Sequence, residues 1–391
     1  MNTKSKQWLG IVIPMLCAVL VISSMAIGGQ AVKNKEQAAA TSNSSQQEPE
    51  TKPKTQTVSL VAVGDNLIHN TIIKSGLQAD GTYDFTSCYT PMKQYIESAD
   101  VAVINQETVL GGKVAEYSGY PMFNTPWEVG EAAIGAGFDV FLNATNHSMD
   151  VGTKGLLNAI KFYEQHPEIT YLGINKDANE YGSVKIVEKN GIRMAMLNYT
   201  FGTNGISVPE DKSWIVNLIN KDKMKSDIET AKKNADVVIV FPHWGTEYST
   251  QISTYQEDLT AFFADNGVDL VIGAHPHVIE PVREVTGADG HKMLVYYSLG
   301  NFISHQNGVD RMLGAMADVK ITKTGDDITI AGKAVPLVTH IQKNGKDAWK
   351  FEVYRLKDYT QALAGVHKES ALSIEKLNKL ADDILGEYKE D

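Results

Sequence analysis

The chain contains the stretch Val268-Asp269-Leu270-Val271-Ile272-Gly273-Ala274-His275-Pro276-His277-Val278, in which an apolar run ends in two histidines. A short, continuous apolar run of this kind is typical of a strand buried on both faces. Two other stretches have the same design, and they end in His243 and in Asn146 with His147. Because the carboxyl ends of parallel strands meet at one edge of an α/β sheet, we expect these side chains to share one crevice.

Three further polar residues, Asp65, Glu107 and Asn301, also follow strand-like apolar runs. Carboxylate, amide and imidazole groups are ligands that suit Mn²⁺, Fe²⁺, Zn²⁺ or Mg²⁺. A carboxylate such as Glu107 can bridge two ions, and two ions roughly 3.5–4 Å apart clamp both oxygens of a phosphoryl displacement. An additional histidine that binds no metal can protonate a leaving group. The sequence therefore predicts a divalent-metal site with one or two ions.

The net charge limits the possible partners of the chain, and the cysteine content limits its possible metal ligands. The 391 residues include 36 basic and 47 acidic ones, and the net charge of −11 argues against a nucleic-acid partner. The only cysteines are Cys17 and Cys88, which have no zinc-finger spacing. Because Cys17 lies in an apolar segment that we assign to the membrane, we expect no disulfide between them. Any metal must then be held by His, Asp, Glu and Asn.

The amino terminus predicts the compartment. Lys4 and Lys6 precede an uncharged, mostly apolar run over residues 7–32. Roughly 20 apolar residues cross a bilayer, and lysines on the short side place that end inside. We therefore expect a transmembrane signal-anchor over residues 1–32 in the cell membrane, with the bulk of the chain extracellular. A cleaved signal peptide is the alternative, since small residues near Gly28 or Ala31 fit a cleavage site.

Residues 33–56 contain no large apolar side chain and predict a disordered linker. From residue 57 onward, strands and helices alternate first and β-rich pairs follow, which implies a mixed α/β sandwich with helices on its outer faces. We expect a main domain over 57–310 and a β extension with a helix over 311–391 that completes it. The expected strands span about 58–63, 101–104, 138–142, 169–173, 183–188, 193–199, 237–241, 268–272, 293–297, 315–322 and 328–336, and the expected helices 152–165, 221–234, 256–266 and 370–388.

The polar motifs, in this order, carry a family resemblance that covers about residues 58–304. They are Gly64-Asp65, Asn105-Gln106-Glu107, Asn146-His147-Ser148-Met149-Asp150, His243-Trp244-Gly245-Thr246-Glu247-Tyr248, Gly273-Ala274-His275-Pro276-His277-Val278 and Tyr297-Ser298-Leu299-Gly300-Asn301-Phe302. The series resembles the CapA family of poly-γ-glutamate capsule biosynthesis proteins, which are related to calcineurin-like metallophosphoesterases. The resemblance implies a four-layered α/β/β/α metallophosphatase-like sandwich on the outer face of the cytoplasmic membrane. It also implies a role in synthesis, export or surface anchoring of poly-γ-glutamate, alongside a membrane synthase or export complex.

The resemblance also implies a role for each residue. Glu107 would bridge two ions. The first ion would also be bound by Asn146, His243 and His275. The second ion would also be bound by Asp65 and His277. His147 matches the catalytic histidine of the phosphoesterases that binds no metal. Leu67 stands where those enzymes place a further histidine, so the ion beside Asp65 lacks a ligand. His69, two residues later, would need an altered loop to replace it.

Other residues are expected to build the walls of the site. Trp244, Glu247 and Asn301 are candidates for substrate binding, and His69 and His305 are candidates for the edge. A structural interpretation remains open for some positions: Asp65 also fits a helix cap, and His243 beside Trp244 also fits a core histidine.

Two classes of function remain open at this point. One is a metal-dependent hydrolase or transferase that acts on a phosphoester or on the amide of an anionic polymer. The other is a non-catalytic module whose metal site binds the carboxylates of poly-γ-glutamate. The acidic net charge repels a polyanion at long range, so a polymer ligand requires a local basic or metal-bearing cleft.

Overall fold

The computed structural model of the chain describes residues 54–346 and 348–390. The expected anchor over residues 1–32 and the linker up to residue 53 lie outside the described residues. The carboxyl end of the linker prediction is wrong, because Thr55 and Gln56 already pair with Thr324 and Lys323 in a sheet. Within the described part of the chain, no helix is long and apolar enough to cross a bilayer.

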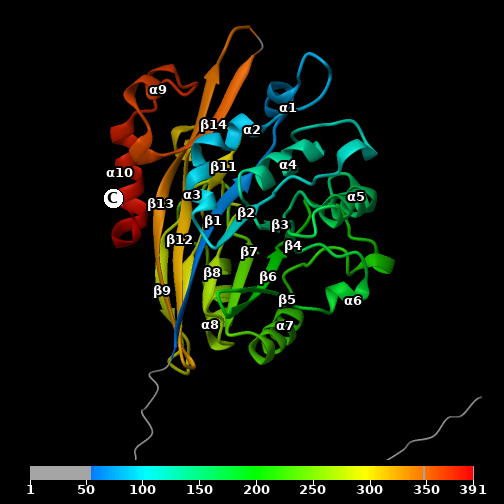
Figure 1. The fold of residues 1–391 in the computed structure, drawn as a ribbon, viewed down its shortest axis with the longest axis vertical. Coiled ribbons are helices and arrows are strands. Elements are labelled where there is room, and N and C mark those ends of the chain that lie inside the picture. Colours follow the sequence, from blue (N-terminus) through cyan, green and yellow to red (C-terminus); the bar gives the residue numbers. More distant parts are fainter. Residues whose placement is uncertain (1–53, 347, 391) are drawn as a thin grey trace, which may run out of the picture. The chain divides into compact units, whose positions relative to one another are not determined.

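The larger of two sheets contains β1 (Thr55–Asn66), β2 (Val101–Asn105), β3 (Val140–Leu142), β4 (Thr170–Leu172), β11 (Asn301–Ile303), β12 (Leu313–Thr324), β13 (Asp327–Lys343) and β14 (Trp349–Arg355). The strand order is β14-β13-β12-β1-β2-β3-β4, and β11 also pairs with β1 (Figure 1). The sheet is mixed: β1 to β4 run parallel, whereas β12, β13 and β14 join by antiparallel pairing. The chain after residue 310 is thus part of the same sheet as β1.

The smaller sheet contains β5 (Lys185–Lys189), β6 (Ile192–Thr200), β7 (Val237–His243), β8 (Leu270–Ile272), β9 (Val282–Thr286) and β10 (Lys292–Tyr296). Its strand order is β5-β6-β7-β8-β10-β9. The inner strands β6, β7, β8 and β10 are parallel, and an antiparallel strand closes each edge. The predicted hairpin between β5 and β6 is confirmed, with both Asn190 and Gly191 at positive φ in its turn.

Helices connect these strands. They are α1 (Asn70–Gly76), α2 (Thr86–Tyr89), α3 (Lys93–Glu97), α4 (Trp127–Gly135), α5 (Gly152–Glu164), α6 (Ala178–Tyr181), α7 (Lys221–Asn234), α8 (Thr254–Asp265), α9 (Gln361–Val366) and α10 (Ile374–Leu385). Short 3₁₀ turns are η1 (Thr90–Met92), η2 (Gly112–Val114), η3 (Glu210–Lys212), η4 (Val309–Met312), η5 (Leu356–Asp358) and η6 (Gly386–Tyr388).

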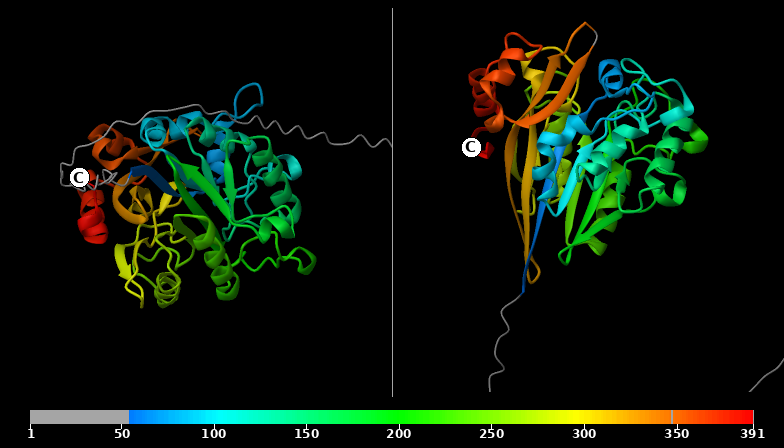
Figure 2. Two further views of the ribbon diagram at one scale, coloured as in Figure 1. Left: turned by 60° about the horizontal axis from the view of Figure 1, so that its bottom comes forward. Right: turned by 45° about the horizontal axis from the view of Figure 1, so that its top comes forward.

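Alternate side chains of β7 show how the layers pack. Val237, Ile239 and Phe241 belong to one core cluster with the larger sheet and with α4 and α5, whereas Val238 and Val240 pack in a second cluster with α7 and α8. Successive residues of a strand point to opposite faces. The two sheets therefore lie face to face with helices outside them, as the views in Figures 1 and 2 show. The predicted α/β sandwich with outer helices is confirmed.

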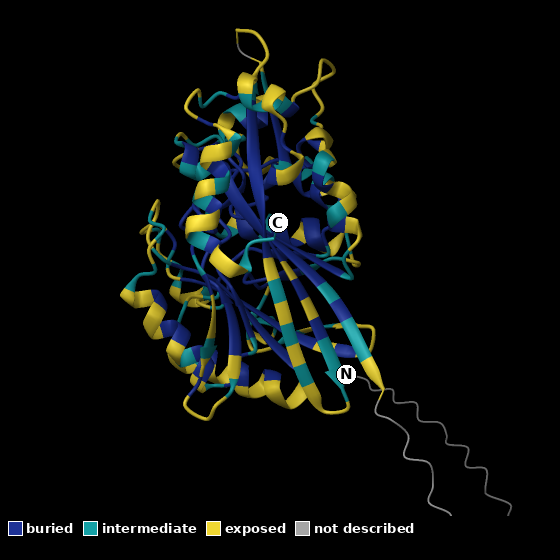
Figure 3. Cartoon of the chain, turned by 90° about the vertical axis from the view of Figure 1, so that its left-hand side faces the viewer, coloured by how far each residue is buried: buried dark blue, intermediate teal, exposed yellow. Residues whose placement is uncertain are grey.

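The hairpin of β12 and β13 reaches beyond this core. The first seven residues of β13 alternate between exposed and half-buried, and the next eight are buried (Figure 3). The sequence prediction ended this strand near residue 336, seven residues short, because it did not include β14, which pairs with residues 337–343.

Candidate metal centre

The carboxyl ends of strands from both sheets meet at one place. Asp65 lies at the end of β1 and His243 is the last residue of β7, while Glu107 follows β2. Asn146 and His147 follow β3, and the two histidines of the opening stretch follow β8. All of these side chains are buried. The predicted convergence of strand ends on one crevice is confirmed.

Unusual backbone conformations bring the histidine pair into the crevice. His275 has φ +105° and His277 has φ +60°, which side-chain-bearing residues rarely adopt and which costs on the order of 1–3 kcal/mol each. The segment after β7 holds this loop: the Trp244 N–H donates to the Ala274 carbonyl at 3.0 Å, and the Tyr248 N–H donates to the Pro276 carbonyl at 2.8 Å. Strand alternation does not orient the two histidines, because β8 ends at Ile272 and both lie in the loop after it.

Close approach of the loops requires glycine at two positions. A Cβ on Gly64 would collide with the carbonyl oxygen of Gly300, and a Cβ on Gly273 would collide with the carbonyl oxygen of Tyr297. The first contact lets β1 run beside β11, and the second lets the histidine loop lie against the end of β10. Both glycines therefore position the ligands rather than contribute to them.

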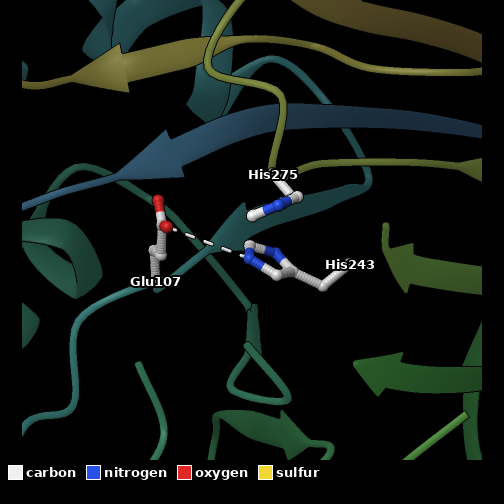
Figure 4. A group of neighbouring side chains, drawn as sticks. All are labelled: Glu107, His243 and His275. Carbon is white, nitrogen blue, oxygen red and sulfur yellow. Dashed lines mark ion pairs between the residues drawn. The ribbon is translucent and has the colours of Figure 1, made fainter. Parts of the chain in front are cut away.

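Two groups of side chains have the geometry of metal ligands. Glu107, His243 and His275 form one group (Figure 4), and Asp65, Glu107 and His277 form the other. Within each group the ligand atoms all lie within 4.8 Å of one another. Glu107 belongs to both groups: its Oε1 lies 3.8 Å from His243 Nε2, and its Oε2 lies 3.7 Å from His277 Nδ1. This is the arrangement of a carboxylate that bridges two ions.

The electrostatics of the crevice fit a cation. Both carboxylate oxygens of Glu107 are buried without a hydrogen-bond partner among the described residues. Burial, followed by the nearby charges of Asp65, Glu247 and Asp150, raises the pKa of Glu107 well above its usual range. A divalent cation would reverse this by stabilising the charged carboxylate.

The two histidines beside Glu107 are held neutral. Burial, reinforced by neighbouring imidazoles, lowers the pKa of His243 well below its usual range. Burial also lowers the pKa of His275 to about 3, with smaller contributions from His277 and His147. A neutral imidazole keeps the lone pair that a metal requires. The donor set of carboxylates and neutral imidazoles therefore fits a divalent cation such as Mn²⁺, Fe²⁺, Zn²⁺ or Mg²⁺.

Amide side chains support both groups. The Asn146 Oδ1 lies 2.9 Å from His243 Nε2, so this amide reaches the group that the resemblance predicted for it. The Asn105 amide donates to Asp65 Oδ1 at 2.8 Å, and the other oxygen of Asp65 lies 2.9 Å from His277 Nδ1. Such contacts orient ligands and are typical of the surroundings of metal sites.

His147 stands beside the ligand groups without belonging to either. Its Nδ1 lies 2.7 Å from Asp150 Oδ2, which also accepts the Phe123 N–H at 2.7 Å. A carboxylate on Nδ1 fixes the ring so that Nε2 is the nitrogen available to a ligand. His147 is outside both ligand groups, as expected for a histidine that binds no metal, and its catalytic role stays a prediction.

A cavity of about 340 Å³, which we call the cleft, opens beside these residues. It is lined by Leu67, His69, Tyr120, Pro121, Met122, Phe123, Asn146, His147, Asn204, Ile206, Glu247, Tyr248, His277 and Gln306. The volume is in the range of small-molecule sites. The metal-ligand side chain of His277 and the imidazole of His147 both face this space, so a substrate in the cleft would contact both.

Leu67 occupies the position of the missing histidine and lines the cleft with an apolar side chain. His69 also lines the cleft, but neither ligand group found in the described residues contains it. Its Nδ1 instead accepts the N–H of His305, which packs behind it against Trp349. His69 is thus an edge residue, as predicted, and His305 supports it from outside the cleft.

The three expected substrate-binding residues have different positions. Glu247 is exposed and lines the cleft. Asn301 is buried and donates to the carbonyl oxygens of His277 and Arg311, so it holds the histidine loop. The expectation for Trp244 is corrected: the ring is fully buried, stacks on Tyr297 and belongs to the core beneath α8. The reason is that it points to the opposite side from His243, its neighbour in the chain.

Sequence reasoning missed Asn204, which lines the cleft, and the contact of Asp150 with the cleft residue His147. Asn204 accepts a hydrogen bond from Asn146 Nδ2 at 3.2 Å, and its own amide lies 3.3 Å from His147 Nδ1. Asp150 was quoted within a motif, but it received no role. A signal existed for Asn204, because it follows β6 at the same edge where the other strands end.

The chain is similar in sequence to known capsule biosynthesis proteins. The profile of the family described as "Bacterial capsule synthesis protein PGA_cap" matches residues 59–306. The chain is 30% identical over 259 residues to the capsule biosynthesis protein CapA of Bacillus anthracis, a match that covers 62% of this chain and 59% of that protein. It is 29% identical over 258 residues to the PGA biosynthesis protein CapA of Bacillus subtilis (strain 168), covering 63% and 58%. Each match covers less than two thirds of the relative's own length.

Solved structures with a similar course of the chain include two nucleotidases. The NAD nucleotidase NadN of Haemophilus influenzae has a TM-score of 0.46 and 12% identity, over 86% of this chain and 57% of that one. A putative 5'-nucleotidase from Staphylococcus aureus has a TM-score of 0.41 and 14% identity, over 84% and 58%.

The family profile covers well over half of the chain, and it contains every residue of the two ligand groups. The predicted resemblance is therefore confirmed, and the chain belongs to the bacterial capsule synthesis protein family PGA_cap.

Proposed function

We propose that this chain acts in the synthesis, export or surface anchoring of poly-γ-glutamate through its metal-binding cleft. Membership of the capsule synthesis family supports the biological role. The observation that carries the proposal is the position of Glu107, a buried carboxylate shared by two ligand groups, one of which includes the cleft residue His277. A chain with a net charge of −11 needs a local cation to attract a polyanion, and a metal held there provides one.

The residues around the ligand groups have defined tasks in this proposal. A divalent cation, when bound, polarises an oxygen of the ligand as a Lewis acid. His147, oriented by Asp150, presents Nε2 to a group in the cleft and can deliver or accept a proton there. Asn204 contacts both Asn146 and His147, so it fixes the position of the metal-binding amide relative to the imidazole that transfers the proton.

We further propose that the chain is anchored in the cytoplasmic membrane with its folded part outside, beside a synthase or export complex. The apolar run over residues 7–32, preceded by Lys4 and Lys6, supports this orientation. Protease treatment of intact cells tests it. Degradation of the folded part without lysis is expected, and full protection in intact cells would contradict it.

Complementation tests the main proposal. The full-length chain is expressed in a poly-γ-glutamate-producing bacterium whose own CapA gene has been deleted, and surface polymer is quantified. The wild-type chain is expected to restore polymer, and Glu107→Gln is expected to abolish the restoration. The matched control Glu229→Gln makes the same change on the exposed side of α7 and should restore polymer fully. Equal restoration by both variants would contradict a role for the metal cleft.

A second function has a specific observation in its favour, namely the pair formed by His147 and Asp150. An imidazole that a carboxylate orients beside a metal site can provide the acid–base catalysis that a metal-dependent phosphoesterase needs. We propose as the alternative a metal-dependent phosphoesterase that acts on another cell-surface substrate. Hydrolysis of a generic phosphodiester by the purified chain, with no effect on polymer in the complementation experiment, would favour this alternative.

A further inference from the structure

A cation that belongs to neither ligand group lies over the ring of Tyr248, a residue that lines the cleft. The chain contains four arginines. Two of them, Arg193 and Arg355, form ion pairs with carboxylates. Arg311 forms no ion pair with any residue of the described part of the chain, although it is half-buried. It lies in η4, just after the end of the family match at residue 306.

Arg311 is held in a defined position against Tyr248, which lines the cleft. Its guanidinium carbon lies 3.9 Å from the centre of the Tyr248 ring, and its Nη1 donates to the Asn307 carbonyl at 2.6 Å. Its own carbonyl accepts the Asn301 amide at 3.2 Å, and the same amide donates to the His277 carbonyl. Arg311 and the metal-ligand loop are therefore fixed to each other through one side chain.

Tyr248 connects Arg311 to the site. The ring lines the cleft, is 44% exposed and lies 5.9 Å from the His277 ring, centre to centre. Its backbone has φ +66°, a conformation that costs on the order of 1–3 kcal/mol and that clusters at ligand-binding sites. An exposed aromatic residue held in such a conformation beneath a guanidinium is a platform for a ligand rather than a packing residue.

A second cation stands on the same side of the cleft. Lys368 Nζ donates to the carbonyl of Gln306, a cleft residue, at 2.7 Å, and lies 3.8 Å from the Glu369 carboxylate. Like Arg311, Lys368 lies after the residues matched by the family profile. Glu247 also lines the cleft and disfavours an anion near its own carboxylate. Of these two cations, Arg311 is the one without a carboxylate partner among the described residues.

We propose that Arg311, seated on Tyr248, forms an anion subsite that binds a carboxylate of the substrate next to the group held at the metal centre. The ligand class is a chain of repeated carboxylates, such as γ-linked glutamate. A guanidinium can donate two parallel hydrogen bonds to a carboxylate. These bonds increase the affinity and also fix the position of the polymer along the cleft. This inference rests on the proposed function, and it assigns a specificity role to a part of the chain outside the family match.

Binding of a synthetic γ-linked glutamate oligomer to the full-length chain loaded with Mn²⁺ tests the subsite. Calorimetry compares the wild-type chain with Arg311→Gln. The matched control is Arg283→Gln, because Arg283 also lies over a tyrosine ring, 5.9 Å from the centre of Tyr297, but on the edge strand β9 away from the cleft. Loss of one charge-assisted contact predicts roughly tenfold weaker binding for Arg311→Gln and unchanged binding for Arg283→Gln.

Additional binding measurements distinguish a failure of the anion subsite from a failure of the proposed function. Inorganic phosphate, as a probe of the metal centre, should bind equally to the wild-type chain and to Arg311→Gln. If Arg311→Gln does not fold, Tyr248→Leu provides a second test. It removes the aromatic ring on which the guanidinium packs, and it should show the same loss of oligomer binding. Unchanged oligomer binding in Arg311→Gln, or equal losses in both arginine variants, would overturn the subsite and leave the proposed function standing. No oligomer binding by the metal-loaded wild-type chain would overturn the polymer role and the subsite together.

Discussion

Nδ1 of His147 lies 2.7 Å from Oδ2 of Asp150, three residues further along the chain. The same carboxylate oxygen accepts the N–H of Phe123, whose ring meets the imidazole edge to face at 4.6 Å. These contacts fix both the tautomer and the plane of the imidazole at the wall of the cleft. The proton transfer proposed for His147 would therefore depend on Asp150, although Asp150 does not line the cleft itself.

Asp150→Asn tests this dependence. An asparagine amide can turn its N–H toward Nδ1 and so favours the wrong tautomer, which is expected to lower phosphodiester hydrolysis by roughly 10²–10⁴-fold. The metal content should not change, since Asp150 belongs to neither ligand group. The control Asp222→Asn makes the same change on the surface of α7. A wild-type rate in Asp150→Asn would show that the pair has no catalytic role.

The two ligand groups should bind ions with different affinity. Because Leu67 supplies no ligand, we expect the ion beside Asp65 to be held more weakly than the ion beside His243. His275→Ala is then expected to remove the tighter of two binding events in a Mn²⁺ titration, and His277→Ala the weaker. His291→Ala, outside both groups, serves as the control. Equal effects of the two site variants on a single binding event would contradict two separate ion positions.

Glu280 gives a prediction for pH dependence. Its side chain is fully buried, one oxygen accepts the Gln256 amide at 2.6 Å, and burial raises the pKa of this carboxyl from 4.5 to about 8. Between pH 4.5 and about pH 8, the Glu280 carboxyl is therefore protonated in the folded chain and ionised in the unfolded chain. The free energy of unfolding should fall across this window as pH rises, by at most about 1.4 kcal/mol per pH unit from this group.

Glu280→Gln keeps the hydrogen-bonding shape without the titration. Urea unfolding at pH 5 and pH 8 should show a smaller loss of stability in the variant than in the wild-type chain. The relevant quantity is the difference between the two chains, because other groups titrate equally in both. Parallel pH profiles would mean that Glu280 is ionised in the folded chain at neutral pH.

Trp244 should matter for stability and not for ligand selection. The indole is fully buried among Phe263, Tyr297 and their neighbours, and its Nε1 donates to the Tyr297 carbonyl at 2.9 Å. Trp244→Ala is expected to lower the free energy of unfolding by about 3–5 kcal/mol. Tyr255→Ala, at an exposed ring on α8, should change it by less than about 0.5 kcal/mol. A small effect of Trp244→Ala on stability would contradict its assignment to the core.

The ligand positions could be predicted from the sequence for a physical reason. Parallel strands buried on both faces read as continuous apolar runs, so the polar residue that ends each run is conspicuous, as with Asp65 and His243. The ends of such strands share one edge, which converts positions far apart in the chain into neighbours. This rule brings Asp65 beside Glu107 and His243 beside His275, and the face-to-face packing of the two sheets brings these two pairs together.

Other features depend on tertiary contacts that leave little local signal. Arg311 reaches the ring of Tyr248 from η4, and its position does not follow an apolar run. β14 has only seven residues, of which the first five alternate apolar and charged, and it is a strand because β13 pairs with it. α4 begins after Pro126 without a side-chain cap, and its packing under the larger sheet decides its conformation.

The central claim is that Glu107 is the ligand shared by the two metal groups. The most direct measurement is the metal content of the purified full-length chain, by mass spectrometry after dialysis, for the wild-type chain, Glu107→Gln and the surface control Glu229→Gln. We predict bound divalent metal in the wild-type chain and in Glu229→Gln, and its loss in Glu107→Gln. Metal retained at the wild-type level in Glu107→Gln, or absent from the wild-type chain under saturating Mn²⁺, would contradict the claim.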